Sequence, residues 1–263
     1  MSKVSSAIYG EMNGPSSFRA QDKLRDSRAV AAMAFPLAWE SNIFKLYDFT
    51  EVALDTTNLW TVNKSASATA NFAKSAGQGG RITANTSATT SQIVAITQAL
   101  DWSSAKNCGM EVRYQVDVVT NLHLEMGFVD ATTATNALSV TGIDTPTLAN
   151  GTVDGALIAM DTGQTTLKTL AVIGGNSNPA ATTKAALGTL APTAATYQSL
   201  RIQTINGTIL GIVKDANGAE LARASIGAGV LPATALKPWI AFSNLTAAGK
   251  NPIIDYIALW QDR

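Results

Sequence analysis

The sequence predicts an all-β protein, an antiparallel β-sandwich or jelly roll that follows an extended N-terminal arm. Residues 110–118 alternate between apolar and polar side chains with a period of two, which is typical of a β-strand. Asn206-Gly207 separates two apolar runs, and this dipeptide is the strongest short-range signal for a β-hairpin. After residue 46 no helical periodicity is present, and Gly, Pro, Asn and Thr separate the apolar runs. Regular strands without intervening helices indicate a sandwich.

The two clearest strands follow each other in the sequence. Residues 110–118 place Glu111 on the face opposite their apolar side chains, and residues 122–128 do the same with His123 and Glu125. Long Thr-, Ala- and Asn-rich stretches are expected to be surface loops, namely 131–150 and 174–196. The other expected strands are 45–50, 59–62, 81–86, 92–97, 156–160, 165–173, 199–205, 208–213, 220–224, 239–243 and 253–260.

The surface is expected to be weakly charged. Charged residues make up 14% of the chain, whereas an average soluble domain has about 25%. Lys and Arg together number 19, as do Asp and Glu, so the net charge is zero. A neutral chain lacks the clustered cations that nucleic-acid binding needs. It also lacks a common safeguard against self-association, so we expect an oligomer and no nucleic-acid partner.

Residues 1–45 are interpreted as an extended or partly helical arm that makes assembly contacts, and residues 46–263 as the sandwich. Six charges lie within residues 19–28, and an apolar stretch interrupted by Pro36 follows. A segment with these two halves reads as an arm that folds against something else, and the alternative is a disordered leader. The side chains expected to make the contacts are Phe18, Arg19, Leu24, Arg25, Arg28, Met33, Phe35 and Trp39.

The chain has no predicted signal peptide or membrane span. Its N-terminus is polar and lacks the apolar segment of a signal peptide. The apolar runs fall far short of the roughly 20 residues that a membrane helix needs. We therefore expect synthesis in the cytoplasm and no membrane partner.

His123 is the only histidine and thus the sole candidate imidazole base. His123 and Glu125 share one strand face, so they could supply two metal ligands if a third came from a neighbour. The favoured interpretation is a solvent-facing pair on an outer sheet face, with no metal and no cofactor. Asp215-Ala-Asn-Gly218 resembles the start of a calcium loop but lacks the later Glu, and a hairpin turn explains it better.

No catalytic constellation is predicted. There is no Gly-x-Ser-x-Gly elbow, and the Gly77–Gly80 run lacks the residues of a phosphate-binding loop. Glycoside hydrolysis needs two carboxyl groups within about 10 Å of each other. Glu111 and Asp117 lie roughly 20 Å apart on one strand, whereas Glu111 and Glu125 on adjacent strands remain a possible pair. An enzyme is the minority interpretation.

Single residues of other types are expected to be structural. Cys108 is the only cysteine, so no internal disulfide can form, and we expect a thiol without function. The large aromatic residues are expected to pack in the core, with exposed sugar-binding platforms as the alternative. They are Trp60, Trp102, Tyr114, Phe128, Trp239 and Trp260.

The order of these strands resembles the concanavalin A-like jelly-roll domains of phage structural proteins. The resemblance implies that the last strand returns beside the first. The lyase and glucanase branches of that family carry a Glu-x-Asp-x-Glu strand, and the matching strand here reads Glu111-Val-Arg-Tyr-Gln115, which argues against hydrolysis. The segments that carry the resemblance are 47–50, 55–60, 110–118, 123–130, 200–204 and 254–261.

A charged and then apolar arm before a jelly roll is also similar to phage capsid decoration and cement proteins. This resemblance implies a non-enzymatic virion protein on the capsid surface that clamps neighbouring major capsid protein subunits, often as a homotrimer. The alternative is a tail-fibre or baseplate component whose sandwich binds host glycans. Which small-molecule ligand, if any, is bound is unknown from the sequence.

Overall fold

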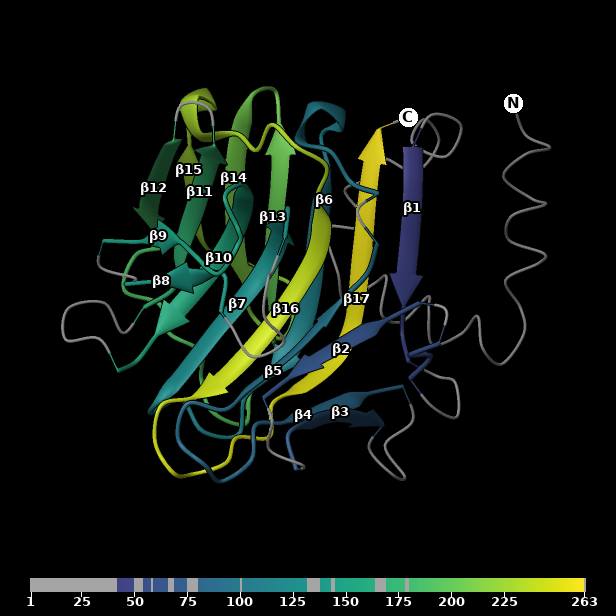
Figure 1. The fold of residues 1–263 in the computed structure, drawn as a ribbon, viewed down its shortest axis with the longest axis vertical. Helices are drawn as coiled ribbons and strands as arrows, with labels where there is room; N and C mark the ends of the chain where they lie inside the picture. Colours follow the sequence, from purple (N-terminus) through teal and green to yellow (C-terminus); the bar gives the residue numbers. More distant parts are fainter. Residues whose placement is uncertain are drawn as a thin grey trace.

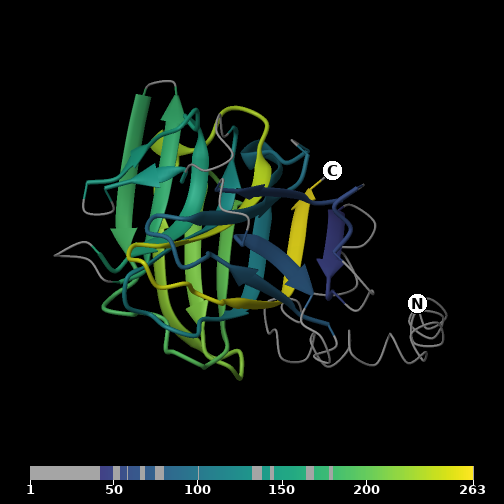
Figure 2. The same ribbon diagram turned by 60° about the horizontal axis from the view of Figure 1, so that its bottom comes forward.

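The computed structural model describes residues 42–49, 54–57, 59–65, 69–74, 80–99, 101–131, 138–142, 145–163, 169–177 and 180–262. This part of the chain folds into two antiparallel sheets that face each other (Figures 1 and 2). The only helices in these ranges are two short 3₁₀ turns, η1 (Ser104–Lys106) and η2 (Ala228–Val230). The all-β antiparallel prediction is confirmed. The eight expected arm contacts, from Phe18 to Trp39, lie outside the described residues.

The first sheet has eight strands in the order β15-β14-β13-β6-β17-β4-β3, and β1 also pairs with β17. Its two central strands, β6 and β17, are long and buried, as the alternation of apolar residues predicts. The bounds are β1 (Asn42–Tyr47), β3 (Asn71–Lys74), β4 (Ile82–Asn85), β6 (Gly109–Gln115), β13 (Gln198–Ile205), β14 (Thr208–Lys214), β15 (Glu220–Ile226) and β17 (Ile253–Asp262).

The second sheet has seven strands in the order β12-β11-β10-β7-β16-β5-β2, and a two-stranded ladder, β8-β9, accompanies it. β7 is its central strand and every residue of β7 is buried. The bounds are β2 (Thr61–Lys64), β5 (Ile93–Thr97), β7 (Leu122–Val129), β8 (Val140–Thr141), β9 (Thr147–Leu148), β10 (Gly155–Asp161), β11 (Ala171–Ser177), β12 (Ala180–Ala186) and β16 (Lys237–Asn244).

The last strand lies beside the first, as the resemblance implies. β1 pairs antiparallel with β17 over six residues, from Asn42 opposite Asp262 to Tyr47 opposite Ile257. Because this ladder begins at Asn42, the expected boundary at residue 46 falls inside β1. Residues 42–45 therefore belong to the sheet.

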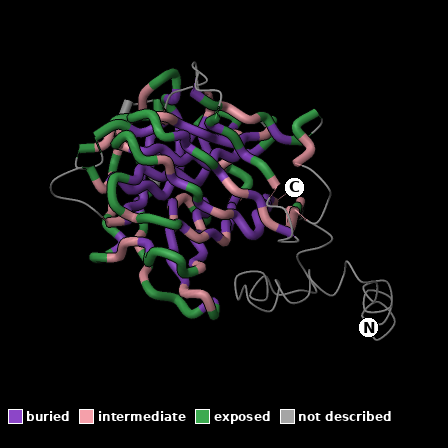
Figure 3. The backbone as a smooth tube through the Cα atoms, turned by 90° about the horizontal axis from the view of Figure 1, so that it is seen from below, coloured by how far each residue is buried: buried purple, intermediate pink, exposed green. Residues whose placement is uncertain are grey.

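The core lies between the two sheets, where the buried backbone gathers in Figure 3. Met110, Val112 and Tyr114 of β6 point into it, and the even-numbered residues of β7 meet them from the other sheet. The period of two is thus confirmed for both strands. Four of the six large aromatic residues pack in this core, as expected, namely Trp60, Trp102, Tyr114 and Phe128. Trp239 and Trp260 are buried as well, but in smaller clusters on the outer faces of the two sheets.

The Asn206-Gly207 hairpin is also confirmed. It joins β13 to β14, with Ile205 opposite Thr208. Asn206 and Gly207 have φ values of +49° and +76°, as the two central residues of a type I′ turn require. Asn and Gly tolerate this conformation best, which is why the sequence signal was specific.

The two expected surface loops are partly wrong. The stretch 174–196 contains the end of β11 and all of β12, and the stretch 131–150 contains β8 and β9. β12 reads Ala-Ala-Thr-Thr-Lys-Ala-Ala and is an edge strand that pairs with β11. The ladder to β11 holds it in the sheet without the alternating apolar pattern by which the other strands were expected. The four-residue strand β3 was not among the expected strands.

Gly127 on β7 allows a close approach of β10. A Cβ atom at this position would lie 2.2 Å from the carbonyl oxygen of Ala156 and 2.8 Å from the Cα of Leu157. Backbone must therefore move in Gly127→Ala, and we expect the free energy of unfolding to fall by about 1–3 kcal/mol in urea denaturation. Gly227→Ala is the matched control, because nothing lies within 4 Å of its Cβ position. Equal losses in the two variants would contradict this packing account.

Candidate functional site

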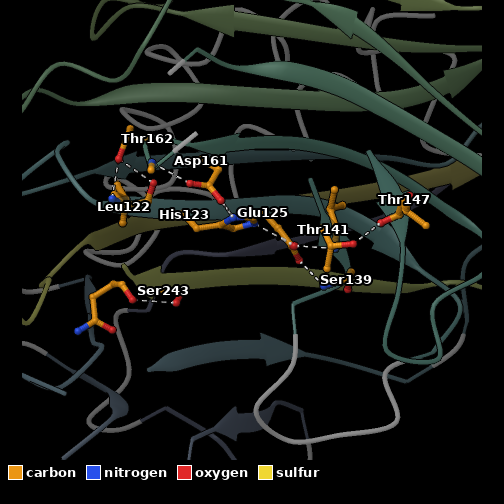
Figure 4. A network of polar contacts seen from close by, with 12 residues as sticks. Leu122, His123, Glu125, Ser139, Thr141, Thr147, Asp161, Thr162 and Ser243 are labelled. Carbon is orange, nitrogen blue, oxygen red and sulfur yellow. Dashed lines mark hydrogen bonds and ion pairs between the residues drawn. The ribbon is translucent and has the colours of Figure 1, made fainter. Parts of the chain in front are cut away.

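The outer face of the seven-stranded sheet carries a buried polar network centred on β7 (Figure 4). His123 and Glu125 alternate with the core-facing residues of β7, so they point away from the sandwich interior. Both side chains are nevertheless buried. The expected solvent-facing pair is therefore wrong, because Ser139 and β8 fold over Glu125 on this part of the face.

Glu125 lies in a row of alanines that leaves room for this cover. Its cross-strand neighbours are Ala241 on β16 and Ala159 on β10, and the next ones are Ala95 and Ala171. Short side chains on both sides allow another backbone segment to reach the carboxylate. A small apolar cluster continues across this face and includes Val140 from β8 and Trp239 from β16.

Each oxygen of the Glu125 carboxylate accepts two hydrogen bonds. Oε1 accepts from the backbone N–H of Val140 at 2.8 Å and lies 3.1 Å from Nε2 of His123. Oε2 accepts from the backbone N–H of Ser139 at 2.9 Å and from Nε1 of Trp239 at 2.7 Å. Four partners fill the lone-pair sites of a carboxylate. Glu125 thus fastens the segment that begins β8 onto the sheet.

His123 bridges Glu125 and a second carboxylate. Its Nδ1 lies 3.1 Å from Oδ2 of Asp161, which is directly opposite His123 in the β7–β10 ladder. The other oxygen of Asp161 accepts the backbone N–H of Gly163 at 2.8 Å. Burial acts to lower the pKa of His123, but the hydrogen bonds and charges of Asp161 and Glu125 outweigh it and raise the pKa to about 9. The imidazolium is therefore the form present at neutral pH.

This arrangement predicts a loss of stability at alkaline pH. The pKa of His123 rises from 6.5 to about 9 on folding. The contribution of protonated His123 to the free energy of unfolding is therefore complete below the pKa of the unfolded chain, and it is lost as the pH rises through the pKa of the folded chain. The free energy of unfolding should fall by up to about 3 kcal/mol over this window. Urea midpoints measured across the window test this, with His123→Gln as the variant in which the slope should flatten. An unchanged slope in that variant would assign the pH dependence elsewhere.

A second buried carboxylate, Glu111, lies on the outer face of the eight-stranded sheet. Its Oε2 is 2.8 Å from Nζ of Lys214 on β14, and its Oε1 accepts the hydroxyl of Tyr256 on β17 at 2.7 Å. Burial lowers the pKa of Lys214, and the charge of Glu111 opposes that effect. Glu111 on β6 thus links this strand to β14 through Lys214 and to β17 through Tyr256.

Glu111 and Glu125 do not form the possible carboxylate pair that the sequence left open. β6 pairs with β13 and β17, whereas β7 pairs with β10 and β16. The two strands follow each other in the chain but belong to opposite sheets, and both carboxylates face outward. The sandwich core separates them, so they cannot act on one glycosidic bond.

Other candidate groups have structural surroundings. Cys108 is buried beside the hydroxyl of Thr204, with its sulfur 3.6 Å from that oxygen, and burial raises the pKa of its thiol to about 12. Asp215 accepts the backbone N–H groups of Asn217 and Ala219, as expected for a turn. No group of three or more His, Cys, Asp or Glu side chains in the described ranges could hold a metal ion.

No helix in the described part of the chain is long and apolar enough to span a lipid bilayer.

Comparison with known proteins supports the fold and leaves the family open. No protein-family model matches the chain, and no curated protein sequence matches it significantly. Among solved structures, peanut lectin aligns with a TM-score of 0.57 at 10% identity, over 83% of this chain and 97% of the lectin. The fold is a concanavalin A-like jelly roll.

Two further structures share this fold. The β-glucanase of Bacillus licheniformis aligns with a TM-score of 0.52 at 12% identity, over 84% of this chain and 98% of the enzyme. The CBM2 module of the evolved Dit of Lactobacillus casei BL23 phage J-1 aligns with a TM-score of 0.50 at 10% identity, over 84% and 96%. At these identities the likeness concerns the fold alone.

Sequence reasoning missed three members of the His123 network: Asp161, Ser139 and Trp239. Asp161 ends β10, one residue beyond the expected strand 156–160, and had no role assigned from the sequence. The Ser139 backbone carries no signal in the sequence, and Trp239 was assigned to the core without a role for its N–H. The cross-strand ladders bring Asp161 to His123 and place Trp239 beside Glu125, and the fold-back of the chain before β8 brings Ser139 to Glu125.

Proposed function

We propose that this chain is a non-enzymatic structural or binding module of a bacteriophage particle, which acts through the surfaces of its sandwich. The observation that carries the proposal is the state of its two buried glutamates. Glu125 has four hydrogen-bond partners and Glu111 has an ammonium and a phenol, on opposite faces. A general base or nucleophile needs a free, reachable lone pair, and both carboxylates instead hold strands and covering segments in place.

In the more specific form of the proposal, the chain decorates the capsid. The sandwich would form an outer knob on the virion, and the N-terminal arm would tie it to the major capsid protein and to sister subunits in a homotrimer. Its zero net charge and its charged content of 14% support a protein whose surface packs against neighbouring subunits. Clamping needs area and shape rather than catalytic groups, and arms that order on binding can cover large surfaces.

A carbohydrate-binding component of the phage tail is the second candidate. The observation that favours it is the likeness of the fold to a lectin and to the CBM2 module of a phage Dit. Neither structure is similar enough in sequence to transfer a binding site, so any ligand must be found on this chain's own surface.

One pair of measurements separates the two candidates. Light scattering gives the mass of the purified protein, and co-sedimentation with expanded, undecorated phage heads tests attachment. A trimer that pellets with heads at a saturable ratio supports decoration. A protein that ignores heads and binds host-surface glycans on an array moves the chain to the tail. Turnover of polysaccharides that is lost in Glu111→Gln or Glu125→Gln would overturn the non-enzymatic proposal altogether.

The arm can be tested by a truncation placed before β1. Deletion of residues 1–41 keeps the whole β1–β17 ladder, so the sandwich should fold with an unfolding midpoint close to that of the full chain. We expect attachment to heads to be lost, as measured by co-sedimentation. Full occupancy by the truncated protein would show that the arm is not the tether.

A further inference from the structure

A row of charged side chains crosses the outer face of the eight-stranded sheet. The ladders place Arg223 of β15 opposite Ile212 of β14, Ile212 opposite Arg201 of β13, and Arg201 opposite Glu111 of β6. These strands lie side by side in Figure 1. Two guanidinium groups therefore flank one isoleucine in a line perpendicular to the strands.

Arg201 has no ion-pair partner even though it lies opposite Glu111. The carboxylate of Glu111 is bound by Lys214 and Tyr256 instead. In the part of the chain that the structure describes, no carboxylate lies within ion-pair distance of Arg201. The sheet thus holds a cation whose charge is not neutralised by contact.

The guanidinium of Arg201 is held in place by neutral groups. It lies over the indole of Trp260, 5.1 Å from the ring centroid, and both its Nε and its Nη2 donate to Oε1 of Gln203, which leaves the other N–H groups of the guanidinium for a ligand. The indole itself lies against Gly109, where a Cβ atom would come within 2.3 Å of the ring. Burial lowers the pKa of Arg201, the charge of Glu111 acts to raise it, and the charge of Arg223 acts to lower it; the net effect is a lowered pKa. Arg201 is thus partly desolvated and fixed before any ligand arrives.

Arg223 supplies a second cation on the same face. It is exposed and bound to Glu220, with Nη2 2.8 Å from Oε2, and an exposed pair of this kind contributes little and exchanges readily. Two strand spacings separate it from Arg201, which is about 9.6 Å between backbones. Solvent reaches the margins of this face, where Ile205 and Leu221 are 40% and 45% exposed, whereas Gln203 and Trp260 beneath Arg201 are buried.

We propose that this face, defined by Arg201, Arg223, Gln203 and Trp260, binds an acidic polysaccharide through the carboxylates of its sugars. The proposal rests on the carbohydrate-binding form of the proposed function and names the class of glycan. A fixed guanidinium over an aromatic ring is suited to a carboxylate, which it can bind through two parallel N–H donors. Two cations in a line fit a polymer with repeated anionic groups better than one isolated acid.

The test measures binding of the full chain to polygalacturonate by isothermal titration at low ionic strength. We expect binding that weakens with added salt, and about a tenfold or greater loss of affinity in Arg201→Gln. Arg223→Gln should reduce affinity less, and it keeps the proposal testable if Arg201→Gln lowers stability. Lys64→Gln is the matched control, because it removes one positive charge from β2 in the other sheet and should leave affinity unchanged.

Three outcomes would overturn the proposal. The first is no binding of polygalacturonate by folded protein, and the second is equal affinity in the wild type and both arginine variants. The third is equally tight binding of duplex DNA, which would indicate general attraction of polyanions. Binding to uncharged dextran alone would leave the carbohydrate function standing and reject this site. Loss of attachment to phage heads in Arg201→Gln, without polygalacturonate binding, would identify a protein carboxylate as the partner and reject the glycan.

Discussion

Replacement of Glu125 with alanine is expected to lower the free energy of unfolding by about 3–5 kcal/mol, the cost of removing one partner from a buried ionic network. The protonated His123 would keep only one carboxylate, Asp161, in a site closed to water. The N–H groups of Ser139, Val140 and Trp239 would lose their acceptor at the same time. Chemical denaturation at neutral pH measures the change.

Glu220→Ala is the matched control for this prediction. Glu220 also takes part in an ion pair, but its side chain and that of Arg223 are exposed, so the expected loss is below about 1 kcal/mol. Hydrogen exchange at Ser139 and Val140 gives a second readout, since these amides should become less protected in Glu125→Ala. If Glu125→Ala were no more destabilising than Glu220→Ala, the network would not be what fastens β8 to the sheet.

Lys214→Met is expected to cost about 3–5 kcal/mol for the corresponding reason on the other sheet. Methionine matches the aliphatic part of lysine, so packing is largely kept while the charge is lost. Glu111 would keep the hydroxyl of Tyr256. The buried carboxylate would lose the ammonium group that contacts it, in a site from which water is excluded.

A double variant separates charge from packing at this site. Glu111→Leu combined with Lys214→Met removes both charges, and replacement of a buried ion pair by apolar residues is often neutral or stabilising. We therefore expect the double variant to recover much of the stability that Lys214→Met loses. If the double variant were less stable than Lys214→Met alone, packing around Glu111 rather than its charge would dominate.

Both predictions bear on function because they assign the buried ionisable groups to the architecture. Glu111, Glu125 and His123 hold strands and covering segments of the chain in place. Contacts with partners, in the proposed function, are therefore assigned to the exposed faces and to the arm. The Arg201 face differs from the two networks, because its cation is fixed but not neutralised by a carboxylate.

The sequence by itself determined the class of fold and the orientation of individual residues. The period of two in residues 110–116 and 122–128 correctly separated core-facing from outward-facing side chains, because this alternation is a local property of the pleated backbone. It failed at Val118, which lies beyond the end of β6 and is exposed. Asn206-Gly207 fixed a hairpin for an equally local reason, the positive φ of a type I′ turn. The return of the last strand beside the first followed from the resemblance and is confirmed by the β1–β17 ladder.

Only the tertiary structure decided which outward faces are covered and which strands are neighbours. Glu111 and Glu125 are 14 positions apart in the sequence, yet they lie on opposite sheets, because ladders between distant segments place β6 and β7. His123 looked solvent-facing because alternation shows the side of the sheet and not what lies on top of it. The burial of its neighbour Glu125 involves backbone amides of Ser139 and Val140, which are the same in every sequence and become specific only when the chain folds back onto β7.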